Sequence, residues 1–440
     1  MSEGKMQSGP PRGRPGSAPM HVAILTNFCL PRGGGEKVAI ESARGLAEAG
    51  LRVTFLHGVE GPADPLLDHP GIRRVGLGLA DVWDQPAWRG ARDGIWNRAA
   101  ARRLAAALAA LRPDCLHLHN WTRSLSPAVL PVLGASGVPV AVTLHDYFLV
   151  CPNGVYYRFD RAEPCSLDPL GARCLAAACD PQSRAHKAVR AARAAATRLA
   201  LRGLRDRPID LVHVCDASRA RLAPMLPEGP FRHHRIDNPV RVDPHPPADP
   251  ARGDAVAFVG RLTREKGADL VAAAARAAGM PALFIGDGPL AGELAAMPGA
   301  EVLGWRAPGE VEALLRARAR AVVAPSRWLE TGPLTVYEAL ACGIPAVASN
   351  RAGAAERIVP GETGFVTRPE VDLLARVFHD LADDTLVRRM GRAAHARYWA
   401  APTTLASHAA ASARLYAALI ARGRAAPATA RAPSFQRSAV

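Results

Sequence analysis

The chain has 440 residues, 49% of them hydrophobic, and carries a formal net charge of +15. This length and apolar content suffice for two domains with separate cores. No run of 18 or more apolar residues is present, which argues against a membrane-spanning helix. The first 19 residues lack an apolar core, so we expect a disordered leader, no secretory signal and a cytoplasmic protein.

The first half of the chain alternates short apolar strands with helices. Strands are expected at residues 20–26, 52–56, 115–119, 139–144 and 210–214, and helices at 36–49 and 95–111. Residues 231–252 contain five prolines and read as a linker. The first domain is therefore expected to span residues 20–238.

The second half repeats this alternation. Strands are expected at residues 255–259, 282–285, 302–303, 321–324, 345–348 and 364–366. Two such series predict an α/β protein with two doubly wound, Rossmann-like domains, the second at residues 239–402. A last helix is expected within residues 403–423, followed by a disordered tail at 424–440.

The most informative segment lies between Glu330 and Pro345 and follows a short buried strand. Gly332 and Pro333 favour a turn and a helix start, and Gly343 favours the helix end. The segment would thus place one carboxylate in a loop, free N–H groups at a helix N-terminus, and a second carboxylate, Glu338, inside the helix. Such N–H groups attract phosphate, and carboxylates accept hydrogen bonds from sugar hydroxyls. The pattern favours a sugar-nucleotide site.

Further glycines and cations occur where other strands end, which is where ligands of such sheets bind. Three glycines, residues 33–35, follow the first strand, and glycine there lets a backbone approach a ligand closely. In the second half, Gly260 precedes Arg261 and Lys266, whose positive charges can converge on a diphosphate. Gly286 follows the next strand.

The two glutamates separated by seven residues, followed by Ala-x-x-x-Gly-x-Pro, resemble the retaining glycosyltransferases of the GT-B fold, family four or group 1. The resemblance covers about residues 20–400. It implies two Rossmann-like domains facing a cleft, a terminal helix that crosses back to the first domain, and no metal requirement for catalysis. Thr331 departs from the family, which commonly has an aromatic residue there, and residues 352–356 lack its paired glycine.

The resemblance also implies roles for individual residues. Glu338 would hold the nucleotide ribose, and Glu330 the hydroxyls of the donor sugar. Arg261 and Lys266 would hold the diphosphate and stabilise charge on the leaving group, and His145 would lie against the transferred sugar. The remaining residues expected at the donor are Gly33, Gly34, Gly260, Gly286, Trp305, Arg306, Gly332 and Leu334. His119 and Asn120 are weaker candidates on the acceptor side.

We therefore expect a glycosyltransferase that moves a sugar from a UDP- or GDP-sugar to a hydroxyl of a saccharide or lipid-linked acceptor, in polysaccharide, glycolipid or glycoconjugate synthesis. Two alternatives stay open: a nucleotide-sugar epimerase of the same fold, and a non-catalytic basic scaffold on a membrane.

The positive charge comes almost entirely from arginine, with only four lysines against 51 arginines. Residues 181–205 contain seven basic residues and no acidic one, and read as a basic amphipathic helix. The helix presents either a solvated face or a surface for anionic lipids, that is, peripheral membrane contact. Because the chain shows no aromatic platform or recognised module for nucleic acid, we expect no such partner.

Four of the eight cysteines cluster within 29 residues, directly after His145: Cys151, Cys165, Cys174 and Cys179. Four thiolates can hold a structural zinc ion, although no Cys-x-x-Cys pair is present. Zinc, free thiols and disulfides all stay open. The other cysteines, Cys29, Cys115, Cys215 and Cys342, stand alone among apolar residues and read as inert core thiols.

Overall fold

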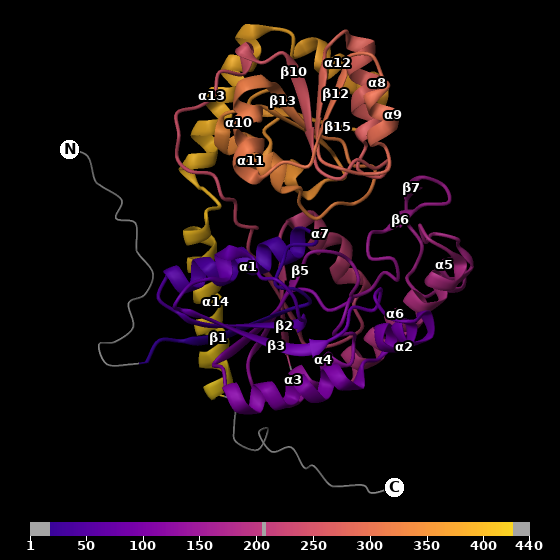
Figure 1. Ribbon diagram of the computed structural model, residues 1–440, viewed down its shortest axis with the longest axis vertical. Coiled ribbons are helices and arrows are strands. Elements are labelled where there is room, and N and C mark those ends of the chain that lie inside the picture. Colours follow the sequence, from indigo (N-terminus) through magenta and orange to yellow (C-terminus); the bar gives the residue numbers. More distant parts are fainter. Residues whose placement is uncertain (1–17, 205–207, 426–440) are drawn as a thin grey trace, which may run out of the picture.

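A computed structural model describes residues 18–204 and 208–425. Residues 1–17 and 426–440, which hold most of the expected leader and tail, lie outside the described part, as does Arg205. Two parallel sheets, each covered by helices on both faces, form the body of the molecule (Figure 1). The expected pair of doubly wound, Rossmann-like domains is confirmed.

The first sheet has seven parallel strands in the order β3-β2-β1-β4-β5-β8-β9. These strands are β1 (His21–Thr26), β2 (Arg52–Val59), β3 (Ile72–Leu79), β4 (Cys115–Leu118), β5 (Val140–Leu144), β8 (Ile209–His213) and β9 (Phe231–Arg235). The first-half helices are α1 (Gly34–Glu48), α2 (Ala87–Ile95), α3 (Arg98–Leu111), α4 (Val129–Ala135), α5 (Ala172–Ala176), α6 (Arg184–Arg202) and α7 (Asp216–Leu222). The same half contains a small antiparallel hairpin formed by β6 (Tyr157–Arg158) and β7 (Glu163–Pro164).

The second sheet has six parallel strands in the order β12-β11-β10-β13-β14-β15. They are β10 (Ala255–Val259), β11 (Ala282–Ile285), β12 (Ala300–Gly304), β13 (Ala319–Ala324), β14 (Ala346–Ser349) and β15 (Gly364–Thr367). The helices are α8 (Ala268–Ala278), α9 (Ala291–Ala295), α10 (Pro308–Arg318), α11 (Leu334–Cys342), α12 (Val371–Asp380), α13 (Asp384–Ala400) and α14 (Leu405–Ala425). Short 3-10 turns occur at Pro65–Leu67, Ala223–Met225, Pro250–Arg252 and Gly353–Arg357.

Two expected elements differ from the structure. The helix expected at residues 95–111 begins three residues later, as α3 at Arg98, because Asn97 caps it by accepting a hydrogen bond from Ala100 N at 3.1 Å. Ile95 instead ends α2, a preceding helix that was not expected. The expected linker 231–252 begins with β9, which pairs in parallel with β8 at the sheet edge. An edge strand pairs with one neighbour only and is less buried than a central strand, so it tolerates polar residues. The sequence Phe-Arg-His-His-Arg therefore lacks the apolar run by which a buried strand is recognised.

Helix α14 leaves the second half of the chain and packs along α1 of the first (Figure 1). Leu415, Tyr416 and Leu419 join the apolar cluster beneath the first sheet. The Tyr416 hydroxyl lies 2.6 Å from Nδ1 of His117 on β4. The two halves are thus joined twice, through residues 236–249 and through the start of α14. In the described part of the chain, no helix has the length and apolar content to cross a membrane.

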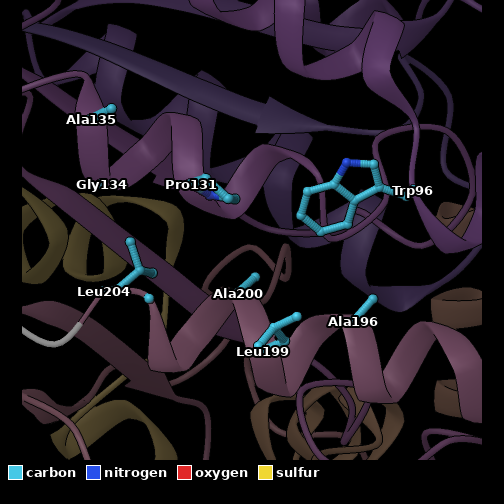
Figure 2. A pocket seen from close by; sticks show the side chains of 9 residues that line it. Trp96, Pro131, Gly134, Ala135, Ala196, Leu199, Ala200 and Leu204 are labelled. Atoms are coloured by element: carbon cyan, nitrogen blue, oxygen red, sulfur yellow. The ribbon is translucent and has the colours of Figure 1, made fainter. Parts of the chain in front are cut away.

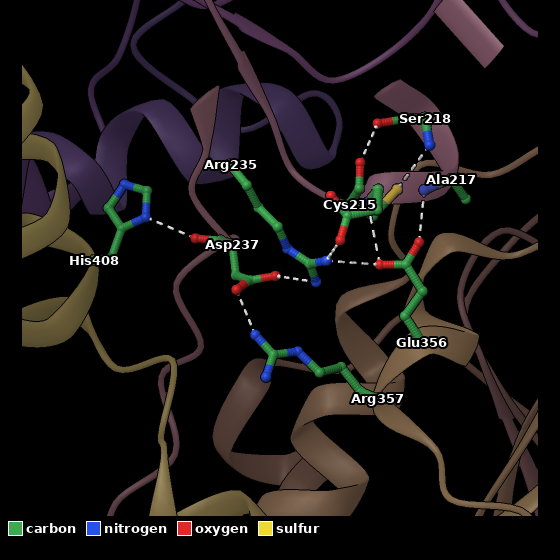
Figure 3. Close-up of polar contacts among 9 residues, drawn as sticks. Cys215, Ala217, Ser218, Arg235, Asp237, Glu356, Arg357 and His408 are labelled. Carbon is green, nitrogen blue, oxygen red and sulfur yellow. Dashed lines mark hydrogen bonds and ion pairs between the residues drawn. The ribbon is translucent and has the colours of Figure 1, made fainter. Parts of the chain in front are cut away.

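A cluster of polar residues forms hydrogen bonds and ion pairs between the two halves, close to these two connections (Figure 3). The Glu356 carboxylate of the second half accepts hydrogen bonds from the N–H groups of Asp216 and Ala217 at the start of α7, at 3.1 and 2.6 Å. Arg235 pairs with the same carboxylate at 3.0 Å and with Asp237 at 3.1 Å. The 352–356 segment, which departs from the family pattern, therefore contacts the first domain here.

Candidate functional site

A cavity of about 220 Å³ lies between the two halves, at the carboxyl ends of their strands. Its first-domain wall includes Gly34 and Gly35 at the start of α1 and residues 145–147 after β5. Its second-domain wall is formed by side chains and backbone that follow β10 and β13. The residues there are Arg261, Lys266, Trp328, Leu329, Glu330, Thr331, Gly332 and Leu334.

The charged centre of this wall is an ion pair between Lys266 and Glu330. The second Glu330 oxygen accepts a hydrogen bond from the Ser326 hydroxyl. The Lys266 ammonium also lies 5.3 Å from the Trp328 ring centroid. Burial by itself would raise the pKa of Glu330, but the charge and hydrogen bond of Lys266 outweigh it and hold that pKa below its usual value. The Glu330 carboxyl group is therefore ionised at neutral pH, and both residues line the cavity.

The loop that carries Glu330 is fixed by its backbone. The Glu330 carbonyl accepts a hydrogen bond from Gly353 N at 2.7 Å. Helix α11 then begins after Pro333 and ends at Gly343, which has φ of +75°. Because Gly332 and Leu334 line the cavity, the N–H groups at the start of α11 lie beside it. A phosphate in the cavity would meet both these groups and Lys266.

Arg261 also lines the cavity. Within residues 18–204 and 208–425, no carboxylate forms an ion pair with its guanidinium. An unpaired arginine beside a cavity is available to an anionic ligand, and its planar fork suits a phosphate.

His145 faces Glu330 from the first domain, at the end of β5. Its Nε2 lies 3.0 Å from Nδ1 of His119, and the two rings stack. Burial, with a smaller effect from His408, lowers the pKa of His145 to about 3, so the ring is neutral. The Thr331 hydroxyl donates to the His145 carbonyl at 2.7 Å and so ties the two walls together. The position where the family commonly has an aromatic residue makes an interdomain hydrogen bond here.

Glu338 does not line the cavity. It lies one turn into α11 and pairs with Lys37 of α1, at 3.2 Å across the two halves. Burial by itself would lower the pKa of Lys37. The nearby carboxylates of Glu338 and Glu41 outweigh this effect and hold that pKa above its usual value. Burial also raises the pKa of Glu41 to about 7. The sequence reasoning missed Lys37 as a site residue, although the rarity of lysine was a usable signal.

Several expected donor residues lie outside the cavity lining. Gly286 packs against Gly260, since a Cβ there would meet the Gly260 carbonyl oxygen at 2.1 Å, so the pair shapes the strand-end loops. The Trp305 side chain is 69% exposed, and Arg306 donates to the carbonyl of Trp305. Gly33 precedes α1 as its N-cap. Asn120 packs over Gly35, where a Cβ would meet its amide at 2.5 Å.

Asp146 is a cavity residue that the sequence reasoning did not single out, although it directly follows His145. It accepts a hydrogen bond from Phe148 N at 2.9 Å, and burial raises its pKa to about 6. In the unfolded chain the pKa of an aspartate is near 3.9, so the folded protein holds the Asp146 proton more tightly. The contribution of this proton to stability is fully present below pH 4 and is lost as the pH rises through 6.

We therefore expect Asp146→Asn to stabilise the protein at pH 7.5, by about 1–3 kcal/mol. Asparagine keeps an oxygen that can accept from Phe148 N but carries no charge to bury. The gain should shrink steadily toward pH 4.5, as urea unfolding over this pH range would show. A gain that is equal at both ends of the range would mean that burial of the carboxylate is not its cause.

The four clustered cysteines are all buried and free of disulfides. Throughout the described ranges, no group of three or more His, Cys, Asp or Glu side chains is arranged to hold a metal ion. The structure thus does not identify these cysteines as zinc ligands. The four isolated cysteines are buried as well.

Two family models match the chain: "Glycosyl transferase 4-like domain" at residues 33–164 and "Glycosyl transferases group 1" at residues 247–397. Together they cover more than half of the sequence and both walls of the cavity. The chain is a group 1 glycosyltransferase. The expected family and enzyme class are confirmed, and the epimerase and scaffold alternatives are set aside.

Solved structures agree with the fold of this group 1 glycosyltransferase. Sucrose-phosphate synthase from Thermosynechococcus elongatus is 19% identical, with a TM-score of 0.66 over 92% of this chain and 100% of that one. Anabaena Alr3699/HepE in complex with UDP-glucose is 18% identical, with a TM-score of 0.62 over 91% and 100%. WaaG, a glycosyltransferase involved in lipopolysaccharide biosynthesis, is 18% identical, with a TM-score of 0.59 over 90% and 99%. The search of curated proteins gave no match.

Proposed function

We propose that this glycosyltransferase transfers a sugar with retention of anomeric configuration from a UDP- or GDP-sugar to a hydroxyl acceptor. The observation that carries the proposal is the Lys266–Glu330 pair, which faces His145 across the cavity. A carboxylate beside a cation can hold sugar hydroxyls while the cation neutralises the departing diphosphate. The complex of Alr3699/HepE with UDP-glucose favours a UDP-sugar as the donor.

The geometry also supports roles for the other residues. Arg261 and Lys266 hold the diphosphate together with the first turn of α11. Glu330 holds the donor hydroxyls. Glu338 holds the ribose once Lys37 releases it. His145, being neutral, donates or accepts a hydrogen bond at the transferred sugar. Since the acceptor attacks from the face that the leaving group vacates, the leaving phosphate takes the acceptor proton, and no protein nucleophile or catalytic metal is needed.

A donor panel tests this function. UDP-, GDP- and ADP-sugars would first be ranked by thermal stabilisation of the protein, and the best donor then incubated with saccharide and lipid-linked acceptors. We expect transfer that continues in EDTA and a product whose anomeric proton coupling matches that of the donor. Inversion of the anomeric centre, or loss of transfer on chelation, would refute the mechanism. The acceptor that reacts would indicate the role in polysaccharide, glycolipid or glycoconjugate synthesis.

We also propose peripheral contact with an anionic membrane through α2 and α6. In the described chain, six large hydrophobic side chains are exposed. Five of them lie on α2, α5 or α6 or next to them: Trp83, Trp88, Trp96, Leu175 and Leu199. Trp96 and Leu199 border an apolar cavity of about 660 Å³ between α4 and α6 (Figure 2). Exposed tryptophans beside arginines suit a membrane interface.

The basic surface is smaller than the sequence suggested. Of the seven basic residues in 181–205, Lys187 is buried, and Arg193 packs over the Phe148 ring and donates to the Pro152 carbonyl. Arg190 pairs with Asp180. The exposed ones among the described residues are Arg184, Arg198 and Arg202.

We expect the triple replacement of Arg184, Arg198 and Arg202 by Gln to weaken binding to anionic liposomes. Each residue contributes about 1 kcal/mol near such a surface. Replacing Arg276, Arg376 and Arg392, which are exposed on the second domain, removes the same charge and should leave binding unchanged. Flotation at low and high salt would measure the effect, which should fade with salt. Equal binding by both triple variants would rule out this surface.

A further inference from the structure

Lys187 is a lysine buried among sulfur atoms. It lies on α6 with 5% of its surface exposed, and its Nζ is 2.9 Å from Sγ of Cys179 and 3.8 Å from Sγ of Cys174. Both thiols are buried. Within residues 18–204 and 208–425, no carboxylate forms an ion pair with this ammonium. The lysine head group therefore contacts two sulfurs where a buried cation ordinarily contacts oxygen.

The burial of this ammonium requires a negative charge nearby. A buried cation without an anion costs several kcal/mol. Burial by itself would lower the pKa of Lys187, but the Cys179 hydrogen bond and the charge of Cys174 outweigh it and raise that pKa. The two sulfur atoms are the side-chain atoms recorded in contact with this ammonium, so the compensating charge has to be sought on them. A neighbouring lysine is a known means of stabilising a thiolate, the reactive form of cysteine.

The rarity of lysine supports a specific purpose. The described part of the chain contains only three lysines: Lys37, Lys187 and Lys266. Lys37 pairs with Glu338 across the two halves of the molecule, and Lys266 pairs with Glu330 in the wall of the cavity. Lys187 is the third, and its partner is Cys179. In a chain that otherwise uses arginine, each lysine sets a compact ammonium against one particular group.

A cavity lies beside this cluster and reaches Lys187. It has a volume of about 460 Å³ and is lined by Lys187 and Ala191 of α6 and by residues 175–178, which lie between the two cysteines in sequence. A molecule the size of a peroxide fits in it easily. The cysteines flank the end of α5, a helix of only five residues, so few backbone hydrogen bonds resist a local rearrangement.

We propose that Cys179 is an oxidisable thiolate and Cys174 its resolving thiol, with Lys187 as the positioning residue. The oxidant is hydrogen peroxide or an organic hydroperoxide. The Cys179 thiolate attacks one peroxide oxygen, the O–O bond breaks, and the other oxygen leaves as hydroxide or alkoxide and takes up a proton. The resulting sulfenic acid is attacked by the Cys174 sulfur, the S–O bond breaks, and a disulfide and water form.

The modification would lie directly behind the first-domain wall of the cleft. The Cys179 carbonyl accepts a hydrogen bond from Nδ2 of Asn153 at 2.9 Å, and Oδ1 of Asn153 accepts from Val155 N at 3.1 Å. Val155 and Gly154 line the cavity that holds Glu330 and His145. One side chain thus connects the oxidisable pair to the acceptor side of the site.

Peptide mapping tests the proposal, because trypsin releases both cysteines in one peptide, residues 174–184. After a brief exposure to hydrogen peroxide and alkylation in denaturant, this peptide should lack two hydrogens and carry no alkyl group, and dithiothreitol should restore two alkylation sites. In Cys174→Ser the proposed resolving thiol is absent, so dimedone should label Cys179. Lys187→Met should slow the oxidation of Cys179 about tenfold or more, since thiolate is lost.

Two matched variants serve as controls. Arg202→Gln removes a positive charge from the exposed end of the same helix, and Cys342→Ser removes a buried thiol elsewhere. Neither should change the oxidation rate of Cys179. The proposal is wrong if peptide 174–184 keeps two alkylatable thiols after peroxide treatment, or if Lys187→Met oxidises as fast as the wild type. It is also wrong if the purified protein holds one zinc ion per chain on these thiols. All readouts are masses or metal content, so they do not depend on glycosyl transfer.

Discussion

Replacing Lys266 with Ala is expected to reduce sugar transfer about a hundredfold or more. Lys266 would stabilise the charge that develops on the leaving diphosphate, and loss of one such contact costs on the order of 2–4 kcal/mol in the transition state. The same change should lower the free energy of unfolding by about 2 kcal/mol, because it leaves the largely buried Glu330 carboxylate without its partner. Single-turnover rates and urea unfolding would measure the two effects.

Arg261→Ala is the matched comparison for this result. It should reduce transfer by a similar factor, since Arg261 lines the same cavity, but the folded protein should lose little stability because no ion pair within the described residues is broken. If either variant keeps wild-type turnover, the assignment of the diphosphate site to these residues is wrong.

Gly353→Ala is expected to reduce transfer about a hundredfold while each domain stays folded. A Cβ at this position would meet the Thr331 carbonyl oxygen at 2.2 Å and Sγ of Cys215 at 2.4 Å. Cys215 belongs to the first domain, so the added methyl group pushes the halves apart and displaces the loop beside Glu330. A displacement of about 1 Å in a catalytic arrangement can cost a hundredfold in rate.

Small-angle scattering would detect the change as a larger radius of gyration in Gly353→Ala. Gly292→Ala is the control, because a Cβ there meets nothing within 4 Å. It should match the wild type in both rate and dimensions. Wild-type activity in Gly353→Ala would show that the closed arrangement of the two halves is not the one that transfers sugar.

The fold was largely predictable because parallel strands buried on both faces are short, nearly continuous apolar runs. β1, β10 and β13 show such runs, and all were expected close to their observed bounds. β3 and β9 were missed. They are the two edge strands of the first sheet, their burial is partial, and their sequences contain arginine, glycine or histidine at positions where a central strand would have valine or isoleucine.

The candidate site was predictable only in part. Lys266, Glu330, Arg261, His145, Gly332 and Leu334 all line one cavity. The motif that resembled the family selected them. The motif could not show that Glu338 pairs with Lys37, that Thr331 donates to the His145 backbone, or that Lys187 contacts Cys179. Trp305 and Gly286 were selected by the same reasoning and lie outside the cavity lining.

The sequence by itself determined which segments become buried strands, where their ends carry glycine, carboxylate or cation, and to which family the chain belongs. These properties are local, because they depend on apolar periodicity, on turn chemistry and on the spacing of a few residues. Only the tertiary structure decided which charges meet. Lys37 and Glu338 are 301 residues apart, and Lys266 and Glu330 are 64 apart. The first contact depends on the packing of the two domains against each other, and the second on the pairing of β10 with β13 within the second domain. No short segment of the chain encodes either.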